Sequence, residues 1–265
     1  MNIYNYSFIE MGEKYMKALI TGASSGIGRD IARYLSDLGY DLIIVARRVE
    51  LLEKLKSELK TNVEIVCLDV SKEENCYKLF EEHKDIDVLV NNAGFGLFGH
   101  FSETDLNKEI NMINTNIIAV HILTKLYVQE MIKKDKGHIL NVASIAGFMV
   151  GPLMSTYYAT KNYVISLSRA INKELKKQKS NVKISVLCPG PVKTEFNDVA
   201  GVKFSMKSLT SEYVAKYAVD KMLKNKEVII PGIAIKLLKL GNKIAPDKVS
   251  IEIAYHAQES KNSHN

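Results

Sequence analysis

The 265-residue sequence has few of the features that build disulfide frameworks, metal sites or membrane spans. Its three cysteines, Cys67, Cys76 and Cys188, form no C-x-x-C pair, so neither a disulfide framework nor a zinc site is indicated. The six histidines lie far apart without an H-x-x-x-H pair, and we predict no catalytic metal. No run of about 18 apolar residues predicts a membrane-spanning helix, and the first residues do not resemble a signal peptide. We therefore expect a cytoplasmic protein.

The charge content does not single out a nucleic-acid partner. Lys and Arg exceed Asp and Glu by a net charge of +6, but the basic residues are scattered among almost as many acids. This distribution favours a solvated surface over a nucleic-acid interface. With 46% hydrophobic and 25% charged residues, the composition is that of an ordinary globular enzyme or binding protein.

Short runs rich in β-branched residues alternate with longer segments of helical period. Between the first two runs, Ile27, Ile31, Leu35 and Leu38 recur at helical spacing and stop at Gly39, a favoured C-terminal cap. Strands separated by such helices need crossovers, which predicts an α/β fold with a doubly wound parallel sheet of the Rossmann type. The seven predicted strands are Ala18 to Thr21, Asp41 to Ala46, Val63 to Leu68, Asp87 to Val90, His138 to Val142, Val182 to Leu187 and Val228 to Ile230.

The pattern divides the chain into one domain and two flanking segments. Residues 16–232 are predicted to form a single dinucleotide-binding and catalytic domain, since no linker or repeat interrupts them. Residues 1–15 are an N-terminal extension that we expect to be dispensable. Residues 233–265 are a C-terminal amphipathic segment and polar tail. Within them, residues 233–245 are expected to border the substrate mouth or a subunit interface, although an anionic membrane would also suit them.

A glycine-rich turn follows the first predicted strand at the start of a helix, with the sequence Gly22-Ala23-Ser24-Ser25-Gly26-Ile27-Gly28. Glycines let the backbone turn tightly beside a pyrophosphate, and the helix N-terminus offers unpaired N–H groups. The spacing departs from the usual G-x-G-x-x-G, and an isolated glycine turn is often no more than a turn. Its place between a strand and an amphipathic helix favours a dinucleotide site that contains Gly22, Ser24, Ser25, Gly26, Ile27 and Gly28.

Two arginines follow the second predicted strand, where an NAD-binding protein usually offers an acid to the ribose. A guanidinium forms charge-assisted bonds with phosphate, so Arg47 and Arg48 are predicted to hold the 2′-phosphate of NADP. The alternative is a pair of ordinary surface arginines. Glu50 is the nearest acid, and its position resembles the first turn of a helix.

A set of polar residues follows the later strands. Asn116 lies in a long predicted helix, Ser144 follows the fifth strand, and Tyr157 and Lys161 open another helix. A tyrosine with a pKa near 10 is a poor acid at neutral pH unless its anion is stabilised. Because positions i and i+4 share a helix face, Lys161 can approach Tyr157 and lower its pKa. Each of these residues, taken alone, could equally be an ordinary surface, turn or helix residue without a catalytic role.

Taken together with the glycine turn and Asn91-Asn92-Ala93-Gly94, these residues resemble the short-chain dehydrogenase/reductase family over residues 17–232. The sequences of residues 137–147 and 188–196 are similar to those of a broad bacterial group of NADP-dependent oxidoreductases. The resemblance implies that Tyr157 is the general acid/base, Lys161 also binds the nicotinamide ribose, Ser144 bonds the substrate oxygen and Asn116 holds a water in a proton relay. Further cofactor contacts implied are Asp69, Val70, Asn92, Ala93, Gly94, Pro189, Gly190, Val192 and Thr194.

The segments expected to surround the substrate are largely apolar. They comprise Phe95 to Phe98, Phe148 to Met154 and the stretch after Thr194 that contains Phe196, Phe204 and Met206, although core packing would explain several of these side chains equally well. We predict hydride transfer between NADP(H) and a carbonyl or alcohol substrate with an apolar body, in a homodimer or homotetramer. A regulatory sensor that binds NADP without turnover is the alternative.

Overall fold

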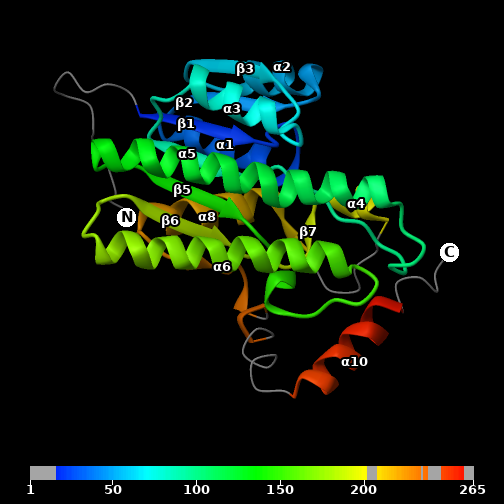
Figure 1. Ribbon diagram of the computed structural model, residues 1–265. Helices are drawn as coiled ribbons and strands as arrows, with labels where there is room; N and C mark the ends of the chain where they lie inside the picture. Colours follow the sequence, from blue (N-terminus) through cyan, green and yellow to red (C-terminus); the bar gives the residue numbers. More distant parts are fainter. Residues whose placement is uncertain (1–15, 202–207, 234, 238–245, 260–265) are drawn as a thin grey trace, which may run out of the picture.

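The computed structural model describes residues 16–201, 208–233, 235–237 and 246–259, and its centre is a seven-stranded parallel sheet (Figure 1). The strand order is β3-β2-β1-β4-β5-β6-β9. This confirms the predicted doubly wound, Rossmann-type fold, and each predicted strand ends within one residue of the observed one. The strands are β1 Lys17–Thr21, β2 Asp41–Ala46, β3 Val63–Cys67, β4 Val88–Asn91, β5 His138–Val142, β6 Lys183–Leu187 and β9 Val228–Ile229.

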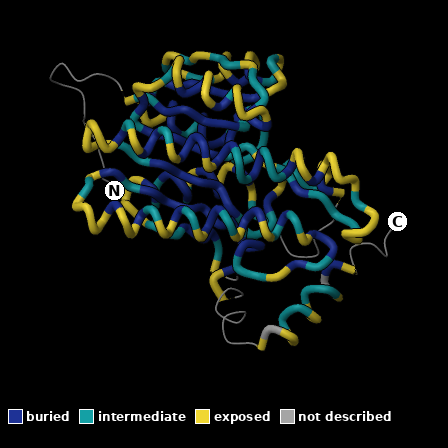
Figure 2. Tube along the Cα trace, in the orientation of Figure 1, coloured by how far each residue is buried: buried dark blue, intermediate teal, exposed yellow. Residues whose placement is uncertain are grey.

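Helices cover both faces of the sheet. On one face lie α1 Gly26–Asp37, α2 Val49–Glu58 and α8 Ser211–Leu223; on the other lie α3 Glu73–Glu82, α5 Ala119–Lys134 and α6 Ser155–Lys177. Because side chains alternate along a strand, Ile20 packs with the first group and Leu19 with the second. Figure 2 shows the result, a buried sheet between helices whose outer sides are exposed.

The first helix matches its predicted period with one exception. Ile31 and Leu35 are fully buried, and Gly39 adopts a φ of +87° just after the helix. Leu38, which the spacing placed on the buried side, is 43% exposed, because the helix ends at Asp37 and Leu38 is its C-cap. Glu50 lies in the first turn of α2, as predicted.

The long helix predicted around Asn116 is present but is not uniform. It runs through α4 Leu106–Ile113, the π-helical segment η1 Asn114–Ile118 and α5. A π-helical turn adds a residue to one turn and is frequent at functional sites. Asn116 therefore lies where the helical backbone departs from its regular pattern.

Several elements were not predicted. A second, two-stranded sheet pairs β7 Val192–Lys193 with β8 Leu209–Thr210, a short helix α7 spans Phe196–Ala200, and a 3-10 helix η2 spans Ile145–Phe148. The helix α10, Asp247–Glu259, was not predicted either. Helical backbone at residues 233 and 235–237 lies within the segment predicted to be amphipathic. In Figure 1, α10 lies apart from the main sheet, below the C-terminal ends of its strands. The N-terminal extension and most of residues 233–245 lie outside the described residues.

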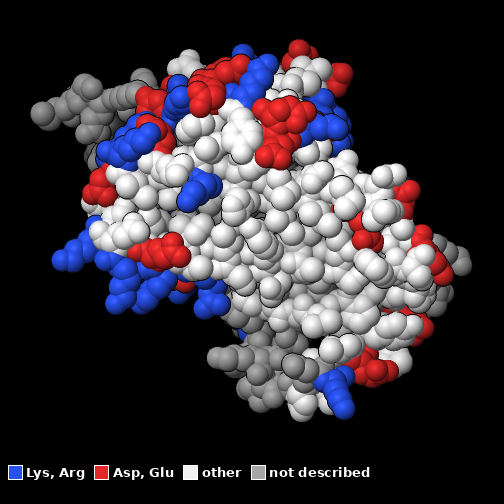
Figure 3. Space-filling view, viewed as in Figure 1, with Lys and Arg blue, Asp and Glu red and all other residues white. Residues whose placement is uncertain are grey.

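Charged side chains are unevenly spread over the face shown in Figure 3. Acids and bases are mixed over the part that contains β1 to β3, whereas the middle of this face carries few charges. Among the described residues, the structure contains no helix of the length and apolar character needed to cross a membrane.

Candidate active site

A cavity of about 1020 Å³ lies where the carboxyl ends of the central strands meet. Its walls come from the turns after β1, β2, β3, β4, β5 and β6. The start of α6, the short helix α7 and one side of α10 complete them. In parallel sheets of this kind, ligands bind at the carboxyl ends of the strands where the chain order reverses, which here is between β1 and β4. The cavity therefore occupies the position expected of a dinucleotide and its substrate.

The glycine turn forms one end of this cavity. Gly22 has a φ of +65°, a conformation that favours glycine. The N-cap residue of α1, Ser25, makes no side-chain cap bond, and the first turn of α1 carries no acid, so the N–H groups and positive end of the helix suit an anion. Four further predicted residues line the cavity with Gly22, namely Ser24, Ser25, Gly26 and Ile27.

Gly28 differs from the rest of the predicted turn because it does not line the cavity. A Cβ atom there would collide with the Asn92 side chain and with the Gly22 carbonyl oxygen, 2.5 Å away. Gly28 is thus needed for close packing beneath the turn. Asn92 reinforces this packing because its Nδ2 donates to the carbonyls of Thr21 at 3.0 Å and Gly22 at 3.1 Å.

Thr21 was missed in the sequence. Its hydroxyl accepts hydrogen bonds from the backbone N–H groups of Asn92 at 3.0 Å and Ala93 at 3.1 Å. These bonds tie the turn after β1 to the turn after β4. Its position immediately before the glycine turn is the sequence feature from which this role could have been predicted.

The two arginines lie at the glycine-turn end of the cavity. Arg48 Nη2 donates to Ser24 Oγ at 3.2 Å and to Glu195 Oε2 at 2.7 Å. Arg47 is more exposed, and its Nη1 lies 3.8 Å from Asp69 Oδ2. Both arginines, Asp69 and the next residue Val70 line the cavity as predicted.

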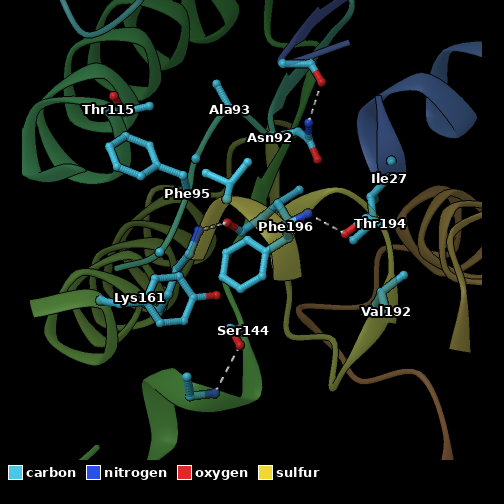
Figure 4. Close-up of a pocket in the computed structure, with 18 of the residues that line it drawn as sticks. Ile27, Asn92, Ala93, Phe95, Thr115, Ser144, Lys161, Val192, Thr194 and Phe196 are labelled. Atoms are coloured by element: carbon cyan, nitrogen blue, oxygen red, sulfur yellow. Dashed lines mark hydrogen bonds between the residues drawn. The ribbon is translucent and has the colours of Figure 1, made fainter. Parts of the chain in front are cut away.

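Ser144 and Lys161 line the middle of the cavity (Figure 4), and Tyr157 lines it with them. Tyr157 is 8% exposed, and burial raises the pKa of its hydroxyl even though a hydrogen bond with Ser144 acts in the opposite direction. Burial lowers the pKa of Lys161 to about 8. Its Nζ donates to the Val142 carbonyl at 3.0 Å and lies 5.8 Å from the centroid of the Tyr157 ring.

The structure brings this pair together but does not show the lowered tyrosine pKa that the spacing predicted. The i and i+4 positions do place Lys161 beside Tyr157. However, desolvation of the phenol is the largest influence on its pKa, and the lysine ammonium bonds to a backbone carbonyl rather than to the hydroxyl. In the structure as described, Tyr157 is therefore a protonated phenol at neutral pH.

Tight packing fixes where α6 presents these two side chains. A Cβ atom on Gly147 of η2 would lie 2.5 Å from the Lys161 carbonyl oxygen, so this glycine lets η2 approach the α6 backbone. Asn162 Nδ2 donates to the Gly147 carbonyl at 2.9 Å. The element that follows Ser144 is thus attached directly to the turn of α6 that carries Lys161.

The side chain of Asn116 has a supporting position. It is fully buried, and its Nδ2 donates to the Phe95 carbonyl at 2.9 Å and to Thr160 Oγ1 at 3.1 Å. Its Oδ1 accepts from the Phe95 N–H at 3.2 Å. Asn116 does not line the cavity, and its side chain joins the loop after β4 to α6; its part in a proton relay stays a prediction.

The remaining predicted cofactor contacts lie along the middle of the cavity. Asn92, Ala93 and Gly94 come from the loop after β4, and a second group follows β6. That second group consists of Pro189, Gly190, Val192 and Thr194. The structure thus brings all of the predicted site residues to the cavity except Gly28 and Asn116.

The part of the cavity predicted to hold the substrate is walled by apolar side chains from several elements. The predicted residues found in the cavity lining are Phe95, Gly96, Leu97, Met149, Met154 and Phe196. The Phe196 ring lies 5.3 Å from that of Tyr157. Phe98 and Phe148 do not line the cavity, and Phe204 and Met206 lie outside the described residues.

A further wall from α10 was missed in the sequence. Ser250, Ile253, Ala254 and Gln258 line the cavity, and Gln258 Nε2 donates to the Tyr158 hydroxyl at 2.7 Å. Ile235 also lines the cavity and is 6% exposed, which agrees with the predicted position of residues 233–245 at the substrate mouth. The C-terminal part of the chain therefore helps to enclose the cavity.

Known proteins share this arrangement. A family model described as short chain dehydrogenase matches residues 16–202. Human dehydrogenase/reductase SDR family member 11 is 33% identical over 193 residues, which cover 68% of this chain and 74% of the human protein. The structure of a short-chain dehydrogenase from Sphingobium yanoikuyae in complex with NADPH matches with a TM-score of 0.77 and 27% identity, over 86% of this chain and 93% of that one.

A short chain dehydrogenase/reductase from Burkholderia phymatum in complex with NAD also has a TM-score of 0.77, over 87% of this chain and 94% of that one. Its identity of 24% supports the fold alone. The family match spans the glycine turn and all four predicted catalytic positions. The chain belongs to the short-chain dehydrogenase family.

Proposed function

We propose that this protein is an NADP-dependent oxidoreductase that transfers a hydride between nicotinamide and a carbonyl or alcohol substrate with an apolar body. The observation that carries the proposal is the Tyr157 hydroxyl, bonded to Ser144 inside a cavity whose far end holds the glycine turn and two arginines. A proton donor and a dinucleotide-shaped site in one cavity are what carbonyl reduction requires.

The residues present fit a nicotinamide dinucleotide. The uncapped N-terminus of α1 suits the pyrophosphate, and the turns after β4 and β6 provide walls for the rest of the molecule. A bound cofactor would supply or accept the hydride. Gly94 allows the loop after β4 to pass close to Asn116 and Lys161. A Cβ atom on this residue would lie 2.9 Å from Asn116 Oδ1 and 3.4 Å from Lys161 Nζ.

In the proposed reduction, the Tyr157 hydroxyl donates its proton to the substrate oxygen while Ser144 orients that oxygen through a hydrogen bond. The raised pKa of Tyr157 keeps the proton in place until the oxygen acquires charge. The Lys161 ammonium stabilises the phenolate that remains. In the reverse direction the same phenolate accepts the alcohol proton.

The preference for NADP over NAD is inferred from the chemistry at the end of β2. Arg47 and Arg48 extend into the cavity lining where an NAD-binding protein usually has an acid. The Ser24 hydroxyl beside Arg48 adds a neutral polar group that phosphate oxygens can use. The NADPH complex of the Sphingobium yanoikuyae relative is consistent with this inference.

Replacing Arg47 by Asp is expected to weaken NADPH binding about tenfold or more, because a charge-assisted phosphate bond is replaced by repulsion. NADH binding should change much less. Titrating both cofactors by isothermal calorimetry checks the prediction, with Lys54→Asp on the exposed side of α2 as a control for net charge. An unchanged ratio of the two affinities in both Arg47→Asp and Arg48→Asp would contradict the NADP assignment.

Turnover distinguishes an enzyme from an NADP sensor. We expect NADPH oxidation with ketones or aldehydes that carry an apolar body, because Phe95, Leu97, Met154 and Phe196 surround the substrate side. A panel of such carbonyl compounds, followed by the fall in NADPH absorbance, tests this. Tight NADPH binding without turnover across the panel would favour the sensor.

Self-association into a homodimer or homotetramer is also proposed. The loop before α4 and the outer side of α4 expose large apolar side chains, with Phe101 71%, Leu106 69% and Ile110 47% exposed. Exposed apolar side chains mark interaction sites where they form one patch, and most soluble oligomers are symmetric assemblies of identical chains. Light scattering coupled to size-exclusion chromatography measures the oligomeric state.

A further inference from the structure

Arg48 is held by a carboxylate that comes from a distant segment of the chain. Its Nη2 lies 2.7 Å from Glu195 Oε2 and also donates to Ser24 Oγ at 3.2 Å. Arg48 follows β2, whereas Glu195 lies between β7 and α7, so the ion pair joins two elements that are 147 residues apart in the chain. The guanidinium predicted to bind the cofactor phosphate therefore already has an anionic partner within the protein.

The surroundings of Glu195 are those of an anion site. It forms a hydrogen bond with Ser25, the N-cap of α1, and Arg29 in the same helix adds a favourable charge interaction. Together with Arg48 these groups hold the pKa of Glu195 below its usual range, so the side chain is ionised at neutral pH. Its carboxylate thus interacts with the same kinds of group, an arginine and the hydroxyl of the helix N-cap serine, that would bind a phosphate.

The backbone next to Glu195 rests directly on the glycine turn. A Cβ atom on Gly26 would lie 2.9 Å from Thr194 Cγ2, which shows how closely the two segments approach. Both Thr194 and Glu195 line the cavity. The carboxylate is therefore placed beside the phosphate-binding turn by its own chain segment as well as by Arg48.

We propose that Glu195 limits the preference for NADP(H) by competing with the 2′-phosphate of the cofactor for Arg48. This inference rests on the proposed NADP function. NAD(H) has no 2′-phosphate and leaves the Arg48–Glu195 pair intact, whereas NADP(H) has to displace the carboxylate. Glu195 therefore lowers the affinity for the phosphorylated cofactor and reduces the discrimination between the two.

The size of the effect follows from the exposure of the pair. The side chains of Arg48 and Glu195 are 48% and 51% exposed, and ion pairs exposed to this degree are screened by water. Such a pair can exchange partners readily. Its loss should change cofactor affinity by a modest factor and leave the fold intact.

The first test is Glu195→Gln, which keeps the side-chain size but removes the charge. We expect NADPH to bind about two- to fivefold more tightly, the range given by an exposed ion pair, and NADH affinity to stay the same. The matched control is Asp198→Asn, which makes the same charge change on α7 at a residue outside the cavity lining. Isothermal calorimetry gives the dissociation constants, and the thermal midpoint of each variant verifies folding.

A second test asks whether the effect depends on Arg48. In an Arg48→Met background, adding Glu195→Gln should produce no further gain in NADPH affinity. A gain of the same size in both backgrounds, or an equal gain for NADH or in Asp198→Asn, would overturn the competition. Equal binding of NADPH and NADH by the wild type would instead refute the NADP proposal, whereas a clear wild-type preference for NADPH that Glu195→Gln leaves unchanged refutes this inference alone.

Discussion

Replacing Tyr157 by Phe is expected to lower kcat for carbonyl reduction by about a hundredfold or more, the usual contribution of a general acid. The substitution removes only the hydroxyl. The ring contacts with Tyr158 at 6.1 Å and Phe196 at 5.3 Å remain, so the cavity wall and NADPH binding should be preserved. A turnover assay and an NADPH titration on the same preparation separate lost chemistry from lost folding.

The adjacent tyrosine provides a matched control. Tyr158 is buried beside Tyr157, but its hydroxyl accepts a hydrogen bond from Gln258 on α10 instead of bonding to Ser144. Tyr158→Phe should therefore remain active. If Tyr157→Phe reduces a ketone at the wild-type rate while Tyr158→Phe does not, the catalytic assignment is displaced by one residue.

Lys161→Met is expected to reduce kcat/KM by about a hundredfold, because the uncharged side chain cannot stabilise the phenolate of Tyr157. Methionine is of similar length and apolar, so it fills the buried position without leaving a charge to solvate. NADPH affinity should also fall, since Lys161 is predicted to bind the nicotinamide ribose. A variant with wild-type kcat/KM would remove lysine from the mechanism.

The pH dependence of kcat/KM provides a second test of the role of Lys161. Because burial lowers its pKa from 10.5 to about 8, the ammonium form predominates below that pH and is lost above it. Wild-type kcat/KM for reduction should therefore fall as the pH rises through about 8. Lys161→Met should lack this fall, and Tyr157, whose pKa is raised, stays protonated throughout the range.

The sheet could be predicted from the sequence because its signal is local and strong. Runs such as β2 are apolar after their first residue, as expected of strands covered on both faces. The site could be predicted as far as it depends on chain order, since the carboxyl ends of parallel strands necessarily meet at one edge of the sheet. Ser144, Tyr157 and Lys161 came together for this reason.

The parts that could not be predicted depend on contacts between distant segments. Whether Gly28 faces the cofactor or packs against Asn92 is decided by the turn after β4, which lies more than sixty residues away. The side chain of Asn116 could face a proton relay or the Phe95 backbone with the same sequence pattern. The pKa of Tyr157 depends on how deeply the whole cavity buries it, and spacing to Lys161 says nothing about this depth.

The helix α10 could not be predicted from the sequence for a different reason. Of the four α10 residues that line the cavity, Ser250, Ala254 and Gln258 are small or polar, and Ile253 is the large apolar one. Ile253 is nevertheless 63% exposed, and Val249, which does not line the cavity, is 49% exposed. Hydrophobic periodicity therefore gives no correct indication of the face that this helix presents.

The position of α10 separates two parts of the chain that can change at different rates in evolution. The family match ends at residue 202, yet α10 supplies a wall of the same cavity and is bonded to Tyr158 through the Gln258 amide. Mutations in this terminal helix can reshape the substrate side without altering the glycine turn or the Tyr157 and Lys161 pair. A change of substrate preference can therefore arise from α10 alone, while the glycine turn and the pair of Tyr157 and Lys161 stay unchanged.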